Sequence, residues 1–146
     1  MHAVFPARCD ANLGVITVTT SRIRVLIEHE DPAVRAAQAA TLGEAGFDVL
    51  TCAGPRAQPG GVCPLVPNGH CEAAEGADVI VNELPLNQVP VYVAQRTNLP
   101  DCPVVLGVSA ADRQRAPRVV GLADTMARDA GGEELVAAVR EAVDGR

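Results

Sequence analysis

The chain has 146 residues, of which 48% are hydrophobic, as is typical of a single globular domain of ordinary size. Its formal net charge of -6 argues against binding to nucleic-acid backbones, and no apolar run approaches the roughly 20 residues that span a bilayer. No signal peptide is recognisable, so we expect a cytoplasmic protein with reduced thiols that contacts neither nucleic acid nor membrane.

Residues 1–22 show little periodicity, and we expect an N-terminal arm there, followed by a domain over 23–146. In that domain β-branched runs alternate with Ala-rich, helix-prone segments. Asp31 and Pro32 are typical of a helix start, and Gly46 of a helix end. The patterns predict strands at 23–27, 47–51, 78–81, 103–108 and 124–127, and helices over 33–45, within 87–98, over 110–119 and over 133–143.

The segment 52–71 interrupts this alternation. Glycine and proline are so dense in it that we expect no lasting helix or strand. A loop of this length inside a compact domain is uncommon and usually carries function. We therefore interpret 52–71 as a Gly/Pro/Cys loop insertion.

Strands that alternate with helices favour an α/β fold with a doubly wound, five-stranded parallel sheet, covered by helices on both faces in three layers. Functional groups in such folds gather at the carboxyl ends of the strands. The residues at those ends are polar or thiol-bearing in this chain: Glu28, His29, Glu30, Cys52, Asn82, Glu83, Ser109 and Arg128.

Five sequence pieces carry a resemblance to a known family: RVLIEHEDPAVRAA, LGEAGFDVLT, ADVIVNELPL, CPVVLGVSA and GGEELVAAVREAV. Through them the segment 23–143 resembles a bacterial response-regulator receiver domain, which implies a flavodoxin-like (CheY-like) fold. In that family two adjacent acids bind magnesium and an aspartate after the third strand accepts a phosphoryl group. A serine or threonine and a lysine contact the phosphoryl oxygens.

The resemblance places altered residues at most of these positions. The acid pair reads His29-Glu30, and the acceptor position reads Glu83, or Asn82 if the strand is one residue shorter. Ser109 retains the hydroxyl, whereas Arg128 stands where the lysine belongs, in a chain whose 12 basic residues are all arginine. Arginine keeps the charge but is not an equivalent phosphate contact.

These changes indicate a pseudo-receiver that has kept the fold and lost aspartyl phosphorylation. Asparagine is not a nucleophile, and the longer Glu83 side chain would misplace the attacking oxygen. One hypothesis is that Glu83 pairs with Arg128 and imitates the activated charge state. We expect a stand-alone, non-catalytic signalling domain without magnesium that binds a protein partner, and we leave a homodimer open.

The cysteine loop supports an alternative function. Cys52, Cys63 and Cys71 lie on one segment, and His70 precedes the last of them. Three thiolates suit zinc or an iron–sulfur cluster, with His70 or an outside group as the fourth ligand. The spacing matches no known zinc ribbon or finger, so reversible thiol oxidation and a purely structural role stay open. A metal- or redox-sensing domain is the alternative interpretation.

Overall fold

The computed structural model describes residues 22–115 and 125–145. These residues form one five-stranded parallel sheet with the strand order β2-β1-β3-β4-β5. The strands are β1 (Arg24–Glu28), β2 (Asp48–Cys52), β3 (Val79–Asn82), β4 (Val104–Val108) and β5 (Met126–Ala127). The predicted doubly wound α/β fold is confirmed, and the expected arm lies outside the described residues apart from Arg22.

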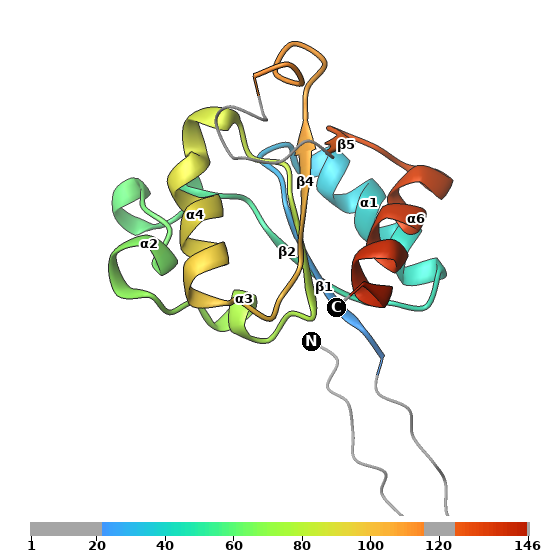
Figure 1. The fold of residues 1–146 in the computed structure, drawn as a ribbon, viewed down its shortest axis with the longest axis horizontal. Coiled ribbons are helices and arrows are strands. Elements are labelled where there is room, and N and C mark those ends of the chain that lie inside the picture. The colour runs from blue at the N-terminus through green and yellow to red at the C-terminus, as the bar shows by residue number, and fades with distance from the viewer. Residues whose placement is uncertain (1–21, 116–124, 146) are drawn as a thin grey trace, which may run out of the picture.

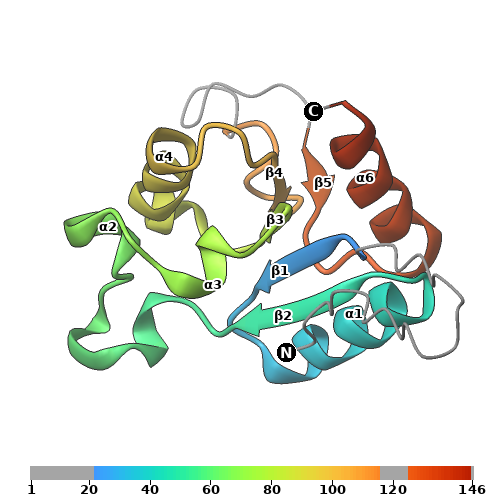
Figure 2. The same cartoon turned by 90° about the horizontal axis from the view of Figure 1, so that it is seen from below.

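Helices cover both faces of the sheet (Figures 1 and 2). The two longest, α1 (Pro32–Glu44) and α6 (Gly132–Asp144), pack side by side on one face. The opposite face carries α2 (Leu65–Asn68), α3 (Glu72–Glu75) and α4 (Val89–Asn98). No helix in the described part of the chain has the length and hydropathy needed to cross a bilayer.

Alternation along β1 separates the two hydrophobic cores. Val25 and Ile27 pack on the α1–α6 side with Leu135 and Val139, whereas Leu26 packs on the α4 side with Ile80. All of these side chains are fully buried or nearly so. Because side chains on a strand point alternately to the two faces, Glu28 falls on the α4 side and His29, next along the chain, returns to the α1 side.

The segment 52–71 holds only short helical turns: η2 (Pro55–Ala57), η3 (Pro59–Gly61) and the four-residue α2. Gly54, Gly60 and Gly61 adopt positive φ angles, which explains why no longer helix forms there. The four-residue α3 was not predicted. It is too short to show a periodic pattern.

The predicted helix over 110–119 is wrong in its described part, where residues 110–115 form successive turns. Ser109 Oγ accepts the backbone N–H of Asp112 at 3.2 Å and donates to its carboxylate at 3.2 Å, so local bonds replace the helical ones. Most of these residues are exposed, so no apolar face packs a helix onto the sheet. The remainder of that prediction lies outside the described residues.

Candidate functional site

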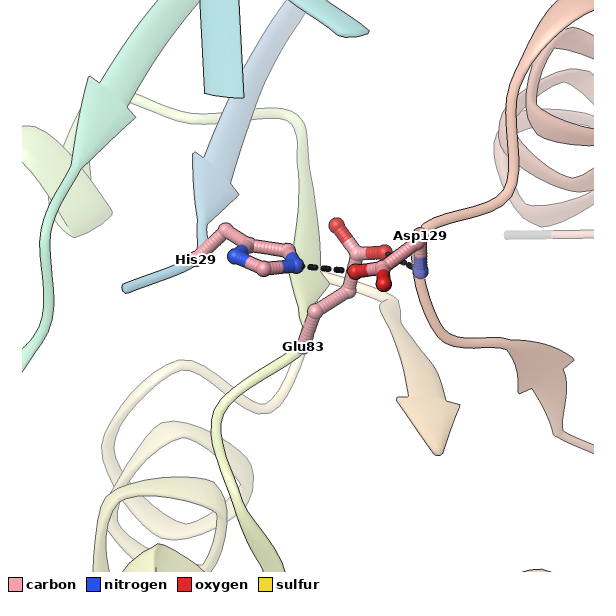
Figure 3. Close-up of side chains that lie close together, drawn as sticks. All are labelled: His29, Glu83 and Asp129. Carbon is pink, nitrogen blue, oxygen red and sulfur yellow. Dashed lines mark hydrogen bonds and ion pairs between the residues drawn. The ribbon is translucent and has the colours of Figure 1, made fainter. Parts of the chain in front are cut away.

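Three polar side chains meet where β1, β3 and β5 end: His29, Glu83 and Asp129 (Figure 3). Their ligand-type atoms all lie within 4.8 Å of one another. His29 Nε2 is hydrogen-bonded to the carboxylate of Asp129, and the backbone N–H of Asp129 donates to Glu83 Oε1 at 2.9 Å. Asp129 has a φ of 66°, a left-handed conformation that is uncommon for a residue other than glycine.

His29 is held in one tautomer by the start of α1. The backbone N–H of Asp31 donates to His29 Nδ1 at 3.0 Å, so this nitrogen is an acceptor and the ring proton lies on Nε2. Nε2 therefore donates to Asp129. Asp31 also caps α1 through its carboxylate, which accepts the N–H of Ala33 at 2.9 Å.

Glu83 is completely buried, and one oxygen of its carboxylate accepts two hydrogen bonds. In addition to the Asp129 N–H, Oε1 accepts Gln38 Nε2 at 3.0 Å, and the same amide donates to Ala130 O at 2.8 Å. Oε2 has no hydrogen-bond partner among the described residues. Burial raises the pKa of Glu83, while the bonds from Gln38 and Asp129 act in the opposite direction.

The described side-chain contacts of Glu30 and Ser109, also predicted for the pocket, are with residues outside this cluster. Glu30 Oε2 lies 3.8 Å from Arg56 Nε, and Ser109 forms a local turn with Asp112. The backbone N–H of Arg128 donates to Val108 O at 2.8 Å. The hypothesis that Glu83 pairs with Arg128 is not supported, because the described contacts of Glu83 are with Gln38 and Asp129.

Asn82 points to the opposite face, where it joins a second buried polar network. Its Oδ1 accepts the backbone N–H of Leu84 at 3.1 Å, and its Nδ2 donates to Gln95 Oε1 at 3.0 Å. Gln95 Nε2 then donates to Glu28 Oε1 at 2.6 Å. Asn82, Gln95 and Glu28 are at most 4% exposed. Glu83, and not Asn82, is therefore the residue that shares a pocket with His29.

The three loop cysteines lie around one small cavity. Cys52, Cys63 and Cys71 line a space of about 50 Å³, together with Glu28. His70 does not line it, because its exposed ring pairs with Glu75 at 2.9 Å. Burial raises the pKa of the Cys52 and Cys63 thiols, which disfavours the reactive thiolate.

No metal centre is preformed at these thiols. Within residues 22–115 and 125–145, only His29, Glu83 and Asp129 bring three ligand-type atoms within 4.8 Å of one another. Zinc or an iron–sulfur cluster at the cysteine loop stays a prediction that this geometry does not favour.

The magnesium that receiver domains bind does not fit the His29 pocket either. Magnesium requires hard oxygen ligands, whereas His29 replaces one acid of the pair and Glu30 faces Arg56. A softer cation meets a different obstacle. Nε2 can bind a metal only if Nδ1 carries the proton, and that proton would point at the N–H of Asp31.

Sequence reasoning missed three residues that shape the two networks, Gln38, Gln95 and Asp129, and it named Glu28 only as one of the polar residues at the strand ends. For Gln38 a signal existed, since it lies four residues before the fully buried Leu42 on an Ala-rich helix and therefore on the same face. For Glu28 the strand alternation placed it on the same face as Leu26. Asp129 offered no sequence signal, because only the fold brings it to His29.

Comparisons with known proteins bear on the fold. No protein-family model matches the chain, and no curated protein matches it. Solved structures do. The chemotaxis response regulator CheY4 of Vibrio cholerae is 19% identical, with a TM-score of 0.57 over 84% of this chain and 99% of that one.

The fold is that of a receiver domain. A crystal form of the same CheY4 obtained at pH 4.0 matches with 18% identity and a TM-score of 0.51, again over 84% and 99% of the two chains. A putative pilus assembly-related protein from Burkholderia pseudomallei matches with 18% identity and a TM-score of 0.58, over 84% of this chain and 90% of that chain. At these identities the likeness establishes the receiver fold alone.

Proposed function

We propose that this chain is a non-catalytic, receiver-like signalling domain that has lost phosphotransfer and acts by binding a protein partner. The observation that carries the proposal is the state of Glu83. Its carboxylate is buried and engaged by Gln38 and by the backbone of Asp129. A nucleophile for phosphoryl transfer must be ionised and open to in-line approach, whereas burial raises the pKa of Glu83.

The surrounding groups support the same conclusion. His29 serves as a hydrogen-bond donor to Asp129 and is oriented against metal binding by Asp31. The His29–Asp129–Glu83–Gln38 network joins the ends of β1 and β3 to α1 and to the β5–α6 connection through hydrogen bonds. These bonds hold the four side chains in one arrangement and engage the carboxylate that would otherwise receive a phosphoryl group. Partner binding is inferred from the receiver fold, because domains of this fold generally act on other signalling proteins.

The test is exposure to a phosphodonor. The purified protein is incubated with acetyl phosphate and magnesium beside a competent receiver domain, and both are analysed by intact-mass and peptide mass spectrometry. We expect a phosphoryl adduct on the competent receiver and none on Glu83. Detection of an acyl phosphate at Glu83 would overturn the proposal. The affinity for a partner, once identified, should be the same with and without acetyl phosphate.

A further inference from the structure

The second buried network connects the sheet to α4 through a carboxyl group that forms no ion pair within the described part of the chain. Glu28 is 4% exposed and ends β1, and Gln95, which is completely buried, lies in α4. The 2.6 Å bond between Gln95 Nε2 and Glu28 Oε1 and the 3.0 Å bond from Asn82 to Gln95 join β1, β3 and α4. This network uses none of the residues of the Glu83 pocket.

The direction of each bond in this network is fixed by the backbone. The N–H of Leu84 donates to Asn82 Oδ1, so the Asn82 amide must present its Nδ2 to Gln95. Gln95 in turn presents Nε2 to Glu28, whose Oε1 is therefore an acceptor. A proton on Glu28 must then reside on the other oxygen, Oε2.

The cavity beside Glu28 cannot stabilise a negative charge. Its wall contains the apolar side chains of Leu26, Leu65 and Val91, the last from α4, as well as the three thiols. An ionised carboxylate there would keep one amide donor and lose its hydration. Burial raises the pKa of Glu28 to about 7, against the lowering effect of the Gln95 bond.

The polar groups that face Glu28 in this cavity are thiols and amides. β2 contributes Cys52, and the 53–71 segment contributes Cys63 and Cys71. Burial raises the pKa of Cys52 and Cys63, so these thiols stay neutral in the same range. β3 and α4 present the amides Asn82 and Gln95, which carry no charge.

Arg35 and His29 approach the end of β1 from the α1 side of the sheet. Arg35 in α1 directs its guanidinium to the backbone, with Nη1 2.7 Å from His29 O and 3.4 Å from Glu30 O. His29 itself points to the α1 side, toward Asp129. Among the described residues, neither Arg35 nor His29 is bonded to the Glu28 carboxyl.

We propose that Glu28 is a proton-binding site that controls how tightly α4 is docked on the sheet. In the protonated form the carboxyl is neutral, and the bonds among Glu28, Gln95 and Asn82 hold α4 in place. In the ionised form the charge is hydrated only when α4 moves away from the cavity. Loss of the proton therefore weakens the docking of α4 while α1 and α6 stay packed. The inference goes beyond the proposed function and does not depend on the loss of phosphotransfer.

The sign of the pH dependence follows from linkage. Glu28 has a higher pKa when α4 is docked than when it is open and the carboxyl is hydrated, so the docked state binds more protons. The proton's stabilisation of the docked state is complete at pH values below the ordinary pKa of glutamate. It is lost as the pH rises to about 7. Between about pH 5 and pH 6.5 the opening equilibrium of α4 should rise roughly tenfold per pH unit, and it should level off above about pH 7.5.

Hydrogen exchange of the full chain, measured by NMR in the presence of a chelator, tests this inference. Protection factors of the α4 amides should fall across pH 5–7 relative to those of α6. They should stay level in Glu28→Gln, which keeps the acceptor for Gln95 without a charge. Glu141→Gln, at an exposed position of α6, is the matched control and should behave as the wild type does.

Two results would overturn the inference: equal pH slopes of α4 protection in the wild type and in Glu28→Gln, or α4 and α6 protection that fall together. If Glu28→Gln does not fold, the inference is tested on the wild type alone, by following the ¹³C shift of the Glu28 carboxyl as a function of pH. A midpoint near 7 supports the inference, and a midpoint near 4.5 refutes it.

Discussion

Asn82 and Glu83 are adjacent in the chain, yet their side chains enter separate hydrogen-bond networks on opposite faces of the sheet. Asn82 bonds to Gln95 in α4, and Glu83 bonds to Gln38 in α1. The backbone N–H of Glu83 also donates to Glu28 O at 2.9 Å, so one short segment at the end of β3 supports both networks. A substitution of Asn82 should therefore disturb the network with α4, and a substitution of Glu83 the network with α1.

The substitution Asn82→Asp should raise the pKa of Glu28 above its value of about 7. The new carboxylate would still accept the N–H of Leu84, but it would present an oxygen to Gln95 Oε1. The Gln95 amide would then turn over and face Glu28 with its oxygen, which requires a proton on Glu28. The added negative charge acts in the same direction.

The measurement is the ¹³C titration of the Glu28 carboxyl in both proteins. Asp101→Asn, at an exposed position, is the control for a change of one charge and should leave the titration unchanged. A Glu28 midpoint that stays the same or falls in Asn82→Asp would contradict the bond directions assigned to Asn82 and Gln95.

Gly107 is a packing requirement of the Glu83 pocket. A Cβ at this position would lie 2.7 Å from Glu83 Cγ and 3.3 Å from Met126 Cε. Glu83 cannot retreat easily, because Gln38 and Asp129 hold its carboxylate. Gly107→Ala should lower the free energy of unfolding by about 1–3 kcal/mol, as overpacked cores do.

Gly43 provides the matched control, since it lies within α1 and a Cβ there meets nothing within 4 Å. Gly43→Ala should raise the free energy of unfolding by about 0.5–1 kcal/mol, because alanine is the better helix former. Urea denaturation of both variants checks the pair. If Gly107→Ala proved neutral, Glu83 would be less firmly held than its bonds indicate.

Much of the fold could be predicted because each element carries its own local signal. The run Ile23–Ile27 indicated a buried strand, and Asp31 with Pro32 marked the start of α1 where the structure has it. The turns at 110–115 could not be foreseen in the same way. Helix propensity there competes with the bonds between Ser109 and Asp112. Because residues 110–115 offer no apolar face to pack on the sheet, tertiary contacts do not stabilise the helix.

The candidate site was predictable only in part. The resemblance to receivers indicated His29 and Glu83, because strand ends converge at one edge of a parallel sheet. Their partners depend on tertiary contacts that no spacing encodes: Asp129 lies 100 residues after His29, and Gln38 lies 45 residues before Glu83. The hypothesis that Arg128 pairs with Glu83 finds no support among the bonds of Glu83 for the same reason, since proximity of two chain segments does not fix which side chains pair.

Gln38 should contribute to stability as the donor to a buried carboxyl. It is 2% exposed and its amide serves both Glu83 Oε1 and Ala130 O. Gln38→Ala removes both bonds and leaves buried acceptors with fewer donors. The expected loss in the free energy of unfolding is about 1–3 kcal/mol.

Gln114→Ala, at an exposed position, is the control and should change the free energy of unfolding by less than about 0.5 kcal/mol. Thermal and urea denaturation measure both variants. A Gln38→Ala protein as stable as the wild type would mean that water replaces the amide at Glu83.

The proposed loss of phosphotransfer should be reversible if it arises from the pocket residues alone. The triple variant His29→Asp, Glu83→Asp, Arg128→Lys supplies an oxygen ligand beside Glu30, a shorter acceptor and a lysine ammonium. His29→Asp also removes the bond to Asp129. We expect this variant to gain a phosphoryl group from acetyl phosphate in the presence of magnesium and to lose it on treatment with hydroxylamine, as an acyl phosphate does.

Glu83→Asp alone is the control, and we expect no phosphorylation of it, because His29 still replaces the first acid and donates to Asp129. Peptide mass spectrometry locates any adduct. Phosphorylation of the single variant would show that side-chain length at position 83 was the sole barrier. A folded triple variant that accepts no phosphoryl group would place the barrier outside these three positions, where Arg56 still faces Glu30 and Asp129 still enters the pocket with a φ of 66°.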